Sequence, residues 1–318
     1  MLDNRGRTID YLRVSLTDRC NFRCIYCMPE KGVGKISHEE IMRFEEVESI
    51  ISACAALGIK KVRFTGGEPL IIKGIDKLIK HTASIPGIND ISLTTNGMLL
   101  NHMAEDLKKA GLKRVNISID TLQEDKFKKI TRFGDFKKVS QAIEKCLSLD
   151  MVPVKLNAVL MKGINDDEIG DFLKLTMDNP IQIRFIELMP IGEGLKYFDN
   201  CSMKVEEVLR LYPELIPIKD DSKVASVYKL PDAKGSVGLI SPVSCKFCNE
   251  CNRIRLTATG TIKPCLHSHE EINLKPYIND EKKLIEVIHN AVYNKPVEHH
   301  LETEGKSDTD RMMFQIGG

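Results

Sequence analysis

One stretch near the start of the chain decides the fold, Tyr11-Leu12-Arg13-Val14-Ser15-Leu16-Thr17-Asp18-Arg19-Cys20-Asn21-Phe22-Arg23-Cys24-Ile25-Tyr26-Cys27-Met28. It begins with a short run typical of a strand and continues into a loop that carries Cys20, Cys24 and Cys27. Three thiolates this close together can each bind one iron of an iron–sulfur cube, which leaves the fourth iron open to a ligand. A structural zinc site would need a fourth ligand, for which His38 is the nearest downstream histidine. Zinc and plain buried cysteine therefore remain alternative interpretations.

Strands and helices alternate from this first strand onward. Apolar residues recur at helical spacing in several segments, and Gly58 and Gly111 stand where two of these helices should end. The predicted strands are 11–16, 60–65, 91–95, 115–119, 154–160 and 181–187. The predicted helices are 44–57, 75–84, 99–110, 137–149 and 167–177. This alternation predicts right-handed βαβ units and a parallel sheet.

About six such units are two fewer than a closed TIM barrel needs, so the alternation favours an α/β fold with an open, partial TIM-like (β/α)6 barrel over a doubly wound sheet. In both architectures ligands bind at the carboxyl ends of the strands. Chemically suggestive residues stand at or near those ends: the cysteine loop, Gly66-Gly67-Glu68-Pro69, residues 94–97, Ser118, Asp120, Asn157 and residues 187–189. We therefore expect these residues to share one site.

The composition changes after about Gly194, where prolines interrupt short strand-like runs. We predict two domains, a partial barrel over 1–194 and a smaller C-terminal module over 195–318 that contains antiparallel strands. Its predicted strands are 225–229, 237–240, 253–257 and 261–263, and its predicted helix is 281–293.

Composition and charge limit the classes of protein to which the chain can belong. The 318 residues include 46 basic and 45 acidic side chains, and this balance does not indicate a nucleic-acid partner. No apolar run approaches the roughly 20 residues that span a bilayer, and the first residues lack the apolar core of a signal peptide. We expect a cytoplasmic protein with no membrane partner. Its ten cysteines then argue against a disulfide framework.

A second cysteine group lies near the end of the chain, at Cys248, Cys251 and Cys265. A structural zinc ribbon is one interpretation, because further ligands stand nearby, namely Cys245, His267 and His269. The other is a second iron–sulfur cube whose open iron binds a nitrogen or oxygen of a ligand.

Cations are expected inside the barrel. Arg253 and Arg255 would point to one face of a strand. Other cations alternate inward on the predicted barrel strands, and a polar side chain would line the same rim: Arg13, Arg63, Lys155 and Thr94. A positive charge in a core is costly unless an anion meets it, so five converging cations suit a triphosphate.

The first cysteine spacing, with Tyr26 before the last cysteine, resembles the cluster loop of the radical S-adenosylmethionine (SAM) superfamily, and residues 66–69 resemble its GGEP segment. The resemblance implies a 4Fe–4S cluster on Cys20, Cys24 and Cys27 that cleaves SAM to a 5'-deoxyadenosyl radical. It also implies the residues that contact SAM, namely Tyr26, Gly67, Glu68, Ser118 and Met189.

More narrowly, the chain is similar to the family of GTP 3',8-cyclases. The similarity covers both cysteine groups, Leu93–Gly97, residues 154–157, 162–166, 184–187 and 247–256, and the terminal Gly317-Gly318. It implies a lyase that converts GTP to (8S)-3',8-cyclo-7,8-dihydroguanosine 5'-triphosphate, the first step of molybdenum cofactor (molybdopterin) biosynthesis. The radical would remove the C3' hydrogen of the ribose, and C3' would then attack C8 of guanine.

The same resemblance implies roles for residues at both ends of the substrate. A second 4Fe–4S cluster on Cys248, Cys251 and Cys265 would hold the guanine ring. The implied GTP contacts are Arg13, Arg63, Thr94, Lys155, Arg253, Ile254 and Arg255. Arg13, Gly317 and Gly318 would also take part in catalysis, with the Gly-Gly tail reaching into the active site.

Other interpretations stay open from the sequence. One is a radical SAM enzyme with an auxiliary Fe–S cluster that modifies a peptide, and another is a ferredoxin-like carrier or a zinc-ribbon protein that is no enzyme. The GTP cyclase resemblance implies an electron donor of the flavodoxin or ferredoxin type and a homodimer. It also implies that cyclic pyranopterin monophosphate synthase receives the product.

Overall fold

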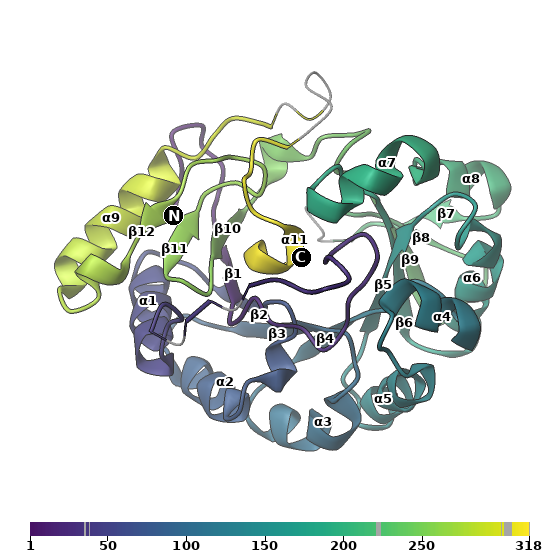
Figure 1. Ribbon diagram of the computed structural model, residues 1–318, viewed down its shortest axis with the longest axis horizontal. Coiled ribbons are helices and arrows are strands. Elements are labelled where there is room, and N and C mark those ends of the chain that lie inside the picture. Colours follow the sequence, from purple (N-terminus) through teal and green to yellow (C-terminus); the bar gives the residue numbers. More distant parts are fainter. Residues whose placement is uncertain (35, 38, 221–223, 300, 302–306, 318) are drawn as a thin grey trace.

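The computed structural model describes residues 1–34, 36–37, 39–220, 224–299, 301 and 307–317. Its centre is a run of parallel strands in sequence order: β1 (Tyr11–Ser15), β2 (Lys61–Thr65), β3 (Asp90–Thr95), β4 (Arg114–Ser118), β5 (Val154–Leu160) and β6 (Ile181–Glu187). The helices between them are α1 (Phe44–Ala56), α2 (Ile75–Ser84), α3 (Leu100–Lys109), α4 (Glu124–Thr131), α5 (Phe136–Ser148) and α6 (Ile169–Asp178). Figure 1 shows these helices on the outside of a ring of strands.

The C-terminal strands extend the same sheet at both ends. Its order is β12-β11-β10-β1-β2-β3-β4-β5-β6-β9-β8-β7. The added strands are β7 (Ile216–Pro217), β8 (Ser226–Lys229), β9 (Ser236–Ile240), β10 (Arg253–Leu256), β11 (Thr261–Lys263) and β12 (Ile272–Asn273). This linear order among the described residues confirms the predicted open, partial barrel.

Antiparallel pairing among the predicted C-terminal strands is confirmed for β8–β9 and β10–β11. Two strands that the sequence did not indicate, β7 and β12, pair antiparallel with β8 and β11. The sequence did not indicate that β9 also pairs parallel to β6, or that β10 also pairs parallel to β1. The pairing of β10 with β1 joins segments far apart in the chain, and local patterns carry no information about such pairs. The domain boundary at residue 194 stays a prediction, since one sheet continues across it.

The remaining helices are short, except for one. They are α7 (Leu195–Cys201), α8 (Glu207–Leu211), α9 (Glu281–Tyr293) and α11 (Met313–Ile316). Single turns of 3-10 helix occur at Pro69–Ile71, Asp166–Glu168, Gly192–Gly194, Cys248–Glu250 and Lys275–Tyr277. Asp135 caps α5 by accepting bonds from the backbone N–H groups of Lys137 and Lys138, at 3.1 and 3.3 Å. No described helix has the length and apolar character needed to cross a bilayer.

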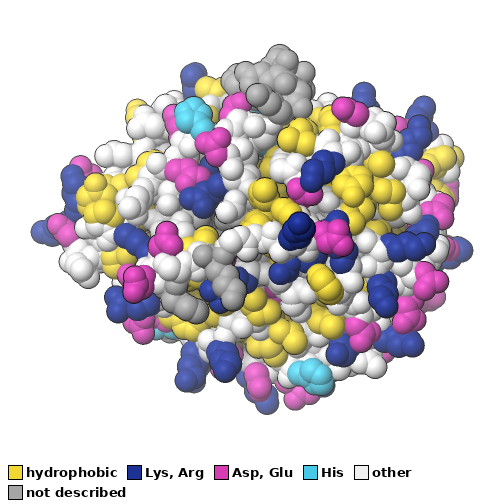
Figure 2. Space-filling view, viewed as in Figure 1, with side chains coloured by type: hydrophobic (Ala, Val, Ile, Leu, Met, Phe, Trp, Pro, Cys, Tyr) yellow, Lys and Arg dark blue, Asp and Glu magenta, His cyan; other side chains and the backbone are white. Residues whose placement is uncertain are grey.

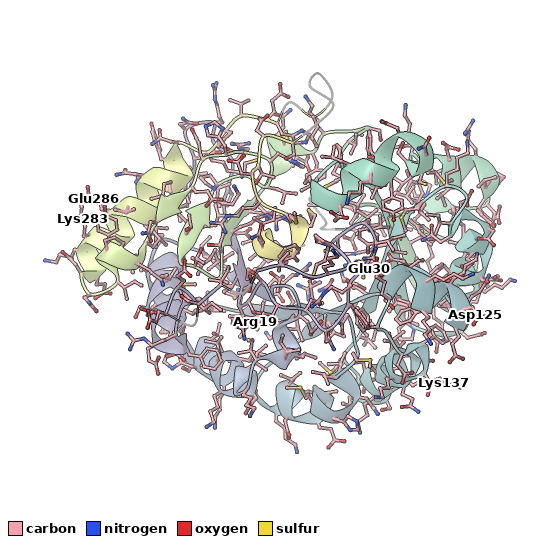
Figure 3. The ribbon with its side chains drawn as sticks, in the orientation of Figure 1. Arg19, Glu30, Asp125, Lys137, Lys283 and Glu286 are labelled. Carbon is pink, nitrogen blue, oxygen red and sulfur yellow. The ribbon has the colours of Figure 1, made fainter. Side chains whose placement is uncertain are left out.

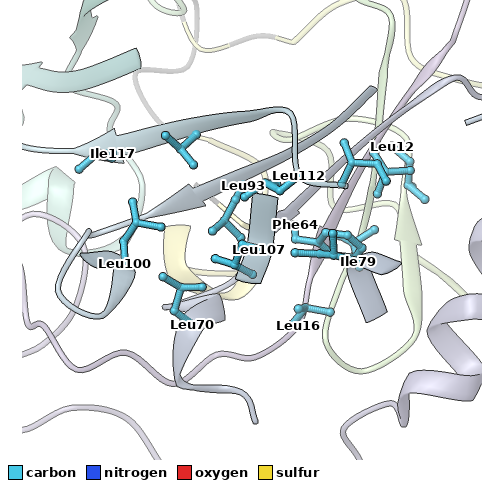
Figure 4. Packing of buried hydrophobic residues seen from close by; sticks show 14 of the residues in the cluster. Leu12, Leu16, Phe64, Leu70, Ile79, Leu93, Leu100, Leu107, Leu112 and Ile117 are labelled. Atoms are coloured by element: carbon cyan, nitrogen blue, oxygen red, sulfur yellow. The ribbon is translucent and has the colours of Figure 1, made fainter. Parts of the chain in front are cut away.

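The two faces of the barrel strands differ in polarity. Outward residues such as Leu12, Phe64 and Leu93 are fully buried, and they pack with helix residues such as Ile79 and Leu107 in one core (Figure 4). The inward row runs in register through polar residues: Arg255, Arg13, Arg63, Ser92 and Arg114. A polar inner face cannot form an apolar core, so the interior of this barrel is suited to a polar ligand.

Candidate active site

The first cysteine group and the GGEP segment meet directly. Gly67 N–H donates to Thr17 O at 2.7 Å, and Glu68 N–H donates to Arg19 O at 2.8 Å. A Cβ atom on Gly67 would lie only 2.2 Å from Arg19 O, so the close approach requires glycine here. The structure thus brings together two segments that the sequence predicted to share a site.

The three N-terminal thiols lie in a pocket that opposes ionisation. Burial raises the pKa of Cys20 to about 11 and that of Cys27 to about 12, and it also raises the pKa of Cys24. The charges of Glu68, near Cys20, and of Asp120, near Cys24 and Cys27, add to this effect. Three thiolates would need positive charge, which iron ions supply when thiolates bind them. The donor set therefore fits a cluster on three cysteines.

Glu68 connects the cluster loop to the next strand end. Its carboxylate is buried and accepts hydrogen bonds from Leu70 N–H (2.9 Å), Thr95 Oγ1 (2.7 Å) and Asn96 N–H (2.7 Å). Burial raises the pKa of Glu68 to about 7. Asn96 Nδ2 in turn donates to Asn21 Oδ1 at 2.7 Å. Glu68 thus has a positioning role within the protein, and its predicted contact with SAM stays a prediction.

Tyr26 is tied to the end of β4. Its hydroxyl donates to Asp120 Oδ2 at 2.8 Å, and Val159 N–H donates to the other carboxylate oxygen at 2.9 Å. Burial raises the pKa of Asp120 to about 6. Ser118, the last residue of β4, lies opposite Asn157 in register, and Met189 follows β6. The predicted SAM contacts therefore come from the cysteine loop and from the carboxyl ends of β2, β4 and β6.

A cavity of about 550 Å³ lies on the inner face of the sheet. It is lined by five cations predicted from sequence, namely Arg13, Arg63, Lys155, Arg253 and Arg255. The sequence reasoning missed four further lining cations, Lys61, Arg114, Arg184 and Lys295. Only two lining residues among those described are acidic, Asp90 and Asp220. Arg184 could have been found, because it lies on β6, three residues before the strand ends at Glu187, and alternates inward.

These cations lower one another's pKa values. Burial, followed by the charge of Arg184, lowers the pKa of Lys155 to about 7. Burial likewise lowers the pKa of Arg184 to about 9 and that of Arg255 to about 10, with neighbouring guanidinium groups as the next cause. The Arg63 and Arg253 guanidinium groups also lie 5.4 and 5.6 Å from the centre of the Tyr11 ring. Such a set is unfavourable when empty and is relieved by a polyanion.

Unpartnered polar atoms also face the barrel interior. In the described part of the chain, Thr94 Oγ1, Asn116 Oδ1, Asn157 Oδ1 and Arg253 Nε are buried and make no hydrogen bond. Buried polar atoms normally have partners, so these atoms are consistent with a ligand that supplies them. Ile254 differs, because its side chain belongs to the hydrophobic core and does not line the cavity. Only its backbone can contact a substrate there.

The second cysteine group lines the same cavity. Cys248 begins a 3-10 turn before β10, Cys251 follows that turn, and Cys265 follows β11. Burial alone would raise the pKa of Cys251, but Lys295, the Arg253 N–H group and nearby guanidinium groups outweigh it and lower this pKa. Burial raises the pKa of Cys248. The three thiols share one wall of the cavity, and the second cluster stays a prediction. His267 is buried beside them, with its Nδ1 3.0 Å from Ser307 Oγ, whereas Cys245 is exposed.

The C-terminal tail enters the centre of the ring, where Figure 1 shows α11. Met313 lines the cavity, and the backbone of Phe314 hydrogen-bonds to Cys27. Arg255 Nη1 donates to Ile316 O at 2.9 Å and to Gly317 O at 2.6 Å. The tail thus lies between the first cysteine loop and the cationic cavity. Gly318 lies outside the described residues.

The surface view agrees with a covered site. In Figure 2 side chains fill the middle of the ring, with Lys and Arg beside hydrophobic side chains. In Figure 3 Arg19 and Glu30 lie toward this middle, whereas Lys283 and Glu286 lie on the outer side of α9.

Comparison with known proteins gives two family matches and many relatives. Residues 14–176 match the Radical SAM superfamily, and residues 181–301 match Molybdenum Cofactor Synthesis C. The chain is 56% identical to the GTP 3',8-cyclase of Clostridium botulinum (strain Hall) and 52% identical to that of Clostridium acetobutylicum, with 100% of each chain covered.

Among solved structures, the fold resembles Streptococcus suis SuiB bound to S-adenosylmethionine, with a TM-score of 0.65 and 15% identity over 91% of this chain and 67% of that one. It also resembles anSMEcpe with bound AdoMet, with a TM-score of 0.57 and 17% identity over 86% of this chain and 80% of that one. These likenesses concern the fold alone.

Proposed function

Because the chain belongs to the GTP 3',8-cyclase family of the radical SAM superfamily, we propose that it converts GTP to (8S)-3',8-cyclo-7,8-dihydroguanosine 5'-triphosphate. This lyase reaction is the first step of molybdenum cofactor biosynthesis. The proposal for this chain rests on the cationic cavity. The second cysteine group lines this cavity, and the tail that borders it contacts the first cysteine group through the backbone of Phe314.

Cys20, Cys24 and Cys27 would hold the first 4Fe–4S cluster, which when bound supplies the electron that cleaves SAM to a 5'-deoxyadenosyl radical. Strand-end residues would hold SAM beside it: Tyr26, Gly67, Glu68, Ser118 and Met189. The Tyr26–Asp120 and Glu68–Asn96 hydrogen bonds fix these strand ends relative to the loop. A primary carbon radical reacts indiscriminately, so residues that hold SAM and the substrate in fixed positions keep the radical from reacting with the protein.

The cationic cavity would bind GTP. Arg13, Arg63, Lys155 and Arg184 surround the space in which the triphosphate would neutralise their charges. Arg253 and Arg255 come from β10, which pairs with β1 on the side opposite β2. The family resemblance adds Thr94, on β3, and the backbone of Ile254 to the proposed contacts. Cys248, Cys251 and Cys265 would hold a second 4Fe–4S cluster whose open iron binds the guanine ring.

The tail would close the site. The Gly317 and Ile316 carbonyl groups accept hydrogen bonds from Arg255, so the tail lies beside a proposed GTP contact. A tail in this position keeps water away from the path between SAM and the ribose C3' hydrogen. We include Gly318 in this role on the family resemblance, along with Arg13.

The test is anaerobic turnover of the reconstituted protein. We expect about eight irons per chain, as for two 4Fe–4S clusters. We also expect 5'-deoxyadenosine release that GTP stimulates and ATP does not. About four irons, with deoxyadenosine release indifferent to GTP, would contradict the substrate and the second cluster together. That outcome would favour the peptide-modifying alternative.

Further partners follow from the same family. We propose a flavodoxin- or ferredoxin-type electron donor, a homodimer, a cytoplasmic location and transfer of the product to cyclic pyranopterin monophosphate synthase. Size-exclusion chromatography with light scattering tests the dimer, and turnover with purified flavodoxin in place of dithionite tests the donor.

A further inference from the structure

A buried lysine lies behind the second cysteine group. Lys295 follows α9 and is only 4% exposed. Its Nζ donates to Arg253 O at 3.0 Å and also to Pro264 O. Arg253 stands two residues after Cys251, and Pro264 directly precedes Cys265. One ammonium group therefore joins the two segments that carry these cysteines.

The third cysteine is tied to the same segment through Arg7. Arg7 Nη1 donates to Cys248 O and to Val297 O, both at 2.9 Å. Its Nη2 donates to Lys295 O at 3.3 Å and to Pro296 O at 2.7 Å. The Lys295 side chain thus contacts two of the cysteine-bearing segments, and Arg7 joins the backbone of residues 295–297 to the third.

Arg7 has an acidic partner, whereas Lys295 has none among the described residues. Arg7 Nε lies 2.6 Å from the buried carboxylate of Asp3, and Lys263 Nζ lies 3.0 Å from Glu271. For Lys295, the described part of the chain contains no carboxylate within ion-pair distance. A buried charge without a counter-charge is costly. Cys248, Cys251 and Cys265 line the same cavity as Lys295, so thiolates there are anionic groups that could offset its charge.

We propose that Lys295 is a positioning residue for the second cluster. Its hydrogen bonds brace the loops of Cys251 and Cys265, and its charge favours the reduced, more negative state of a cluster bound there. This inference rests on the second cluster of the proposed function. The two cysteine groups would then differ in the charges beside them. Lys295 lies beside the second group, whereas the groups beside the first include the carboxyl groups of Glu68 and Asp120.

The test separates charge from hydrogen bonding. Lys295→Gln keeps an N–H donor and removes the charge, whereas Lys295→Arg keeps both. Lys283→Met is the control, because Lys283 lies on the outer side of α9 (Figure 3). Each change is made in full-length protein in which Cys20, Cys24 and Cys27 are alanine, so that only the second cluster can be bound. The readouts are iron content and the midpoint potential from an EPR-monitored titration.

We expect the potential of Lys295→Gln to fall. A unit charge at about 10 Å in a medium with an effective dielectric constant of about 20 shifts a one-electron equilibrium by about tenfold. At a fixed solution potential, the ratio of reduced to oxidised cluster should therefore fall by about tenfold in Lys295→Gln. It should stay near the parent value in Lys295→Arg and Lys283→Met.

The outcomes distinguish this inference from the proposed function. A parent protein that binds no iron at the second site would overturn the second cluster and this inference together. About four irons in the parent, with an unchanged potential in Lys295→Gln, would overturn this inference alone. Loss of iron from Lys295→Gln but not from Lys295→Arg would support it. Loss from both variants, with normal iron in Lys283→Met, would overturn the role of the charge.

Discussion

Replacing Gly317 by alanine should release the C-terminal tail from the active site. Gly317 has a φ of +71°, and a Cβ atom there would lie 2.0 Å from Thr65 Oγ1 and 3.1 Å from Thr65 Cβ. Thr65 is buried in β2, so it cannot move aside without disturbing the sheet. The tail, which ends two residues beyond α11, is the part that can move.

The expected loss of docking free energy follows from the positive φ of Gly317 and from the contact that its Cβ atom would make with Thr65. The left-handed backbone costs an alanine about 1 kcal/mol more than glycine, and overpacking adds about 1–3 kcal/mol. The two Arg255 hydrogen bonds that hold the tail contribute about 1.5–3 kcal/mol each before the entropy of ordering is subtracted. A total penalty of about 2–4 kcal/mol should lower the ratio of docked to released tail by about 30- to 700-fold.

The assay compares Gly317→Ala with Gly163→Ala. Gly163 has a similar φ of +73° but no heavy atom within 4 Å of its would-be Cβ, so it carries the backbone cost without the clash. We expect Gly317→Ala to lose about tenfold or more of its GTP cyclisation, to keep deoxyadenosine formation, and to become sensitive to carboxypeptidase. Wild-type turnover and protection in Gly317→Ala, or an equal loss in Gly163→Ala, would refute the reasoning.

Four other changes have defined outcomes. The pKa of Lys155 is about 7 in the free protein, and bound GTP would favour its charged form. The dissociation constant of GTP, measured by calorimetry, should therefore rise by up to about tenfold per pH unit between pH 7 and 9. Lys155→Arg should make this dissociation constant less dependent on pH. Arg184→Met should weaken GTP binding by about tenfold or more, unlike the exposed control Arg210→Met, and equal affinities would contradict the role of Arg184. Glu68→Gln should lower the free energy of unfolding by about 1–3 kcal/mol in urea titrations, because one buried N–H or O–H donor loses its acceptor. Cys245→Ser should leave the iron content unchanged, since this thiol is exposed; loss of about four irons would identify it as a ligand.

Local patterns explain why much of the site could be predicted. The inward position of Arg13, Arg63 and Lys155 follows from the two-residue period of a strand, once the strands are placed. Arg184 obeys the same period on β6, and the sequence contained the signal for it. The prediction that Thr94 lines the same rim as the cations is wrong: its hydroxyl is buried without a hydrogen bond among the described residues, and the cavity lining does not include Thr94.

Other features had no local signal. The pairing of β10 with β1 places Arg255 beside Arg13, and these residues are far apart in the chain. Arg7 and Lys295 look like ordinary surface cations in the sequence, yet both are buried against the second cysteine group. Their positions depend on how the N-terminal arm and the segment after α9 pack together.

The sequence alone determined the strand–helix alternation, the two cysteine groups and the family, because periodicity and ligand spacing are properties of neighbouring residues. The tertiary structure alone decided which strands extend the barrel, which cations share one cavity and which lysine lies behind the second cysteine group. Burial and charge compensation depend on every segment that surrounds a residue, so they are fixed only when distant parts of the chain come together.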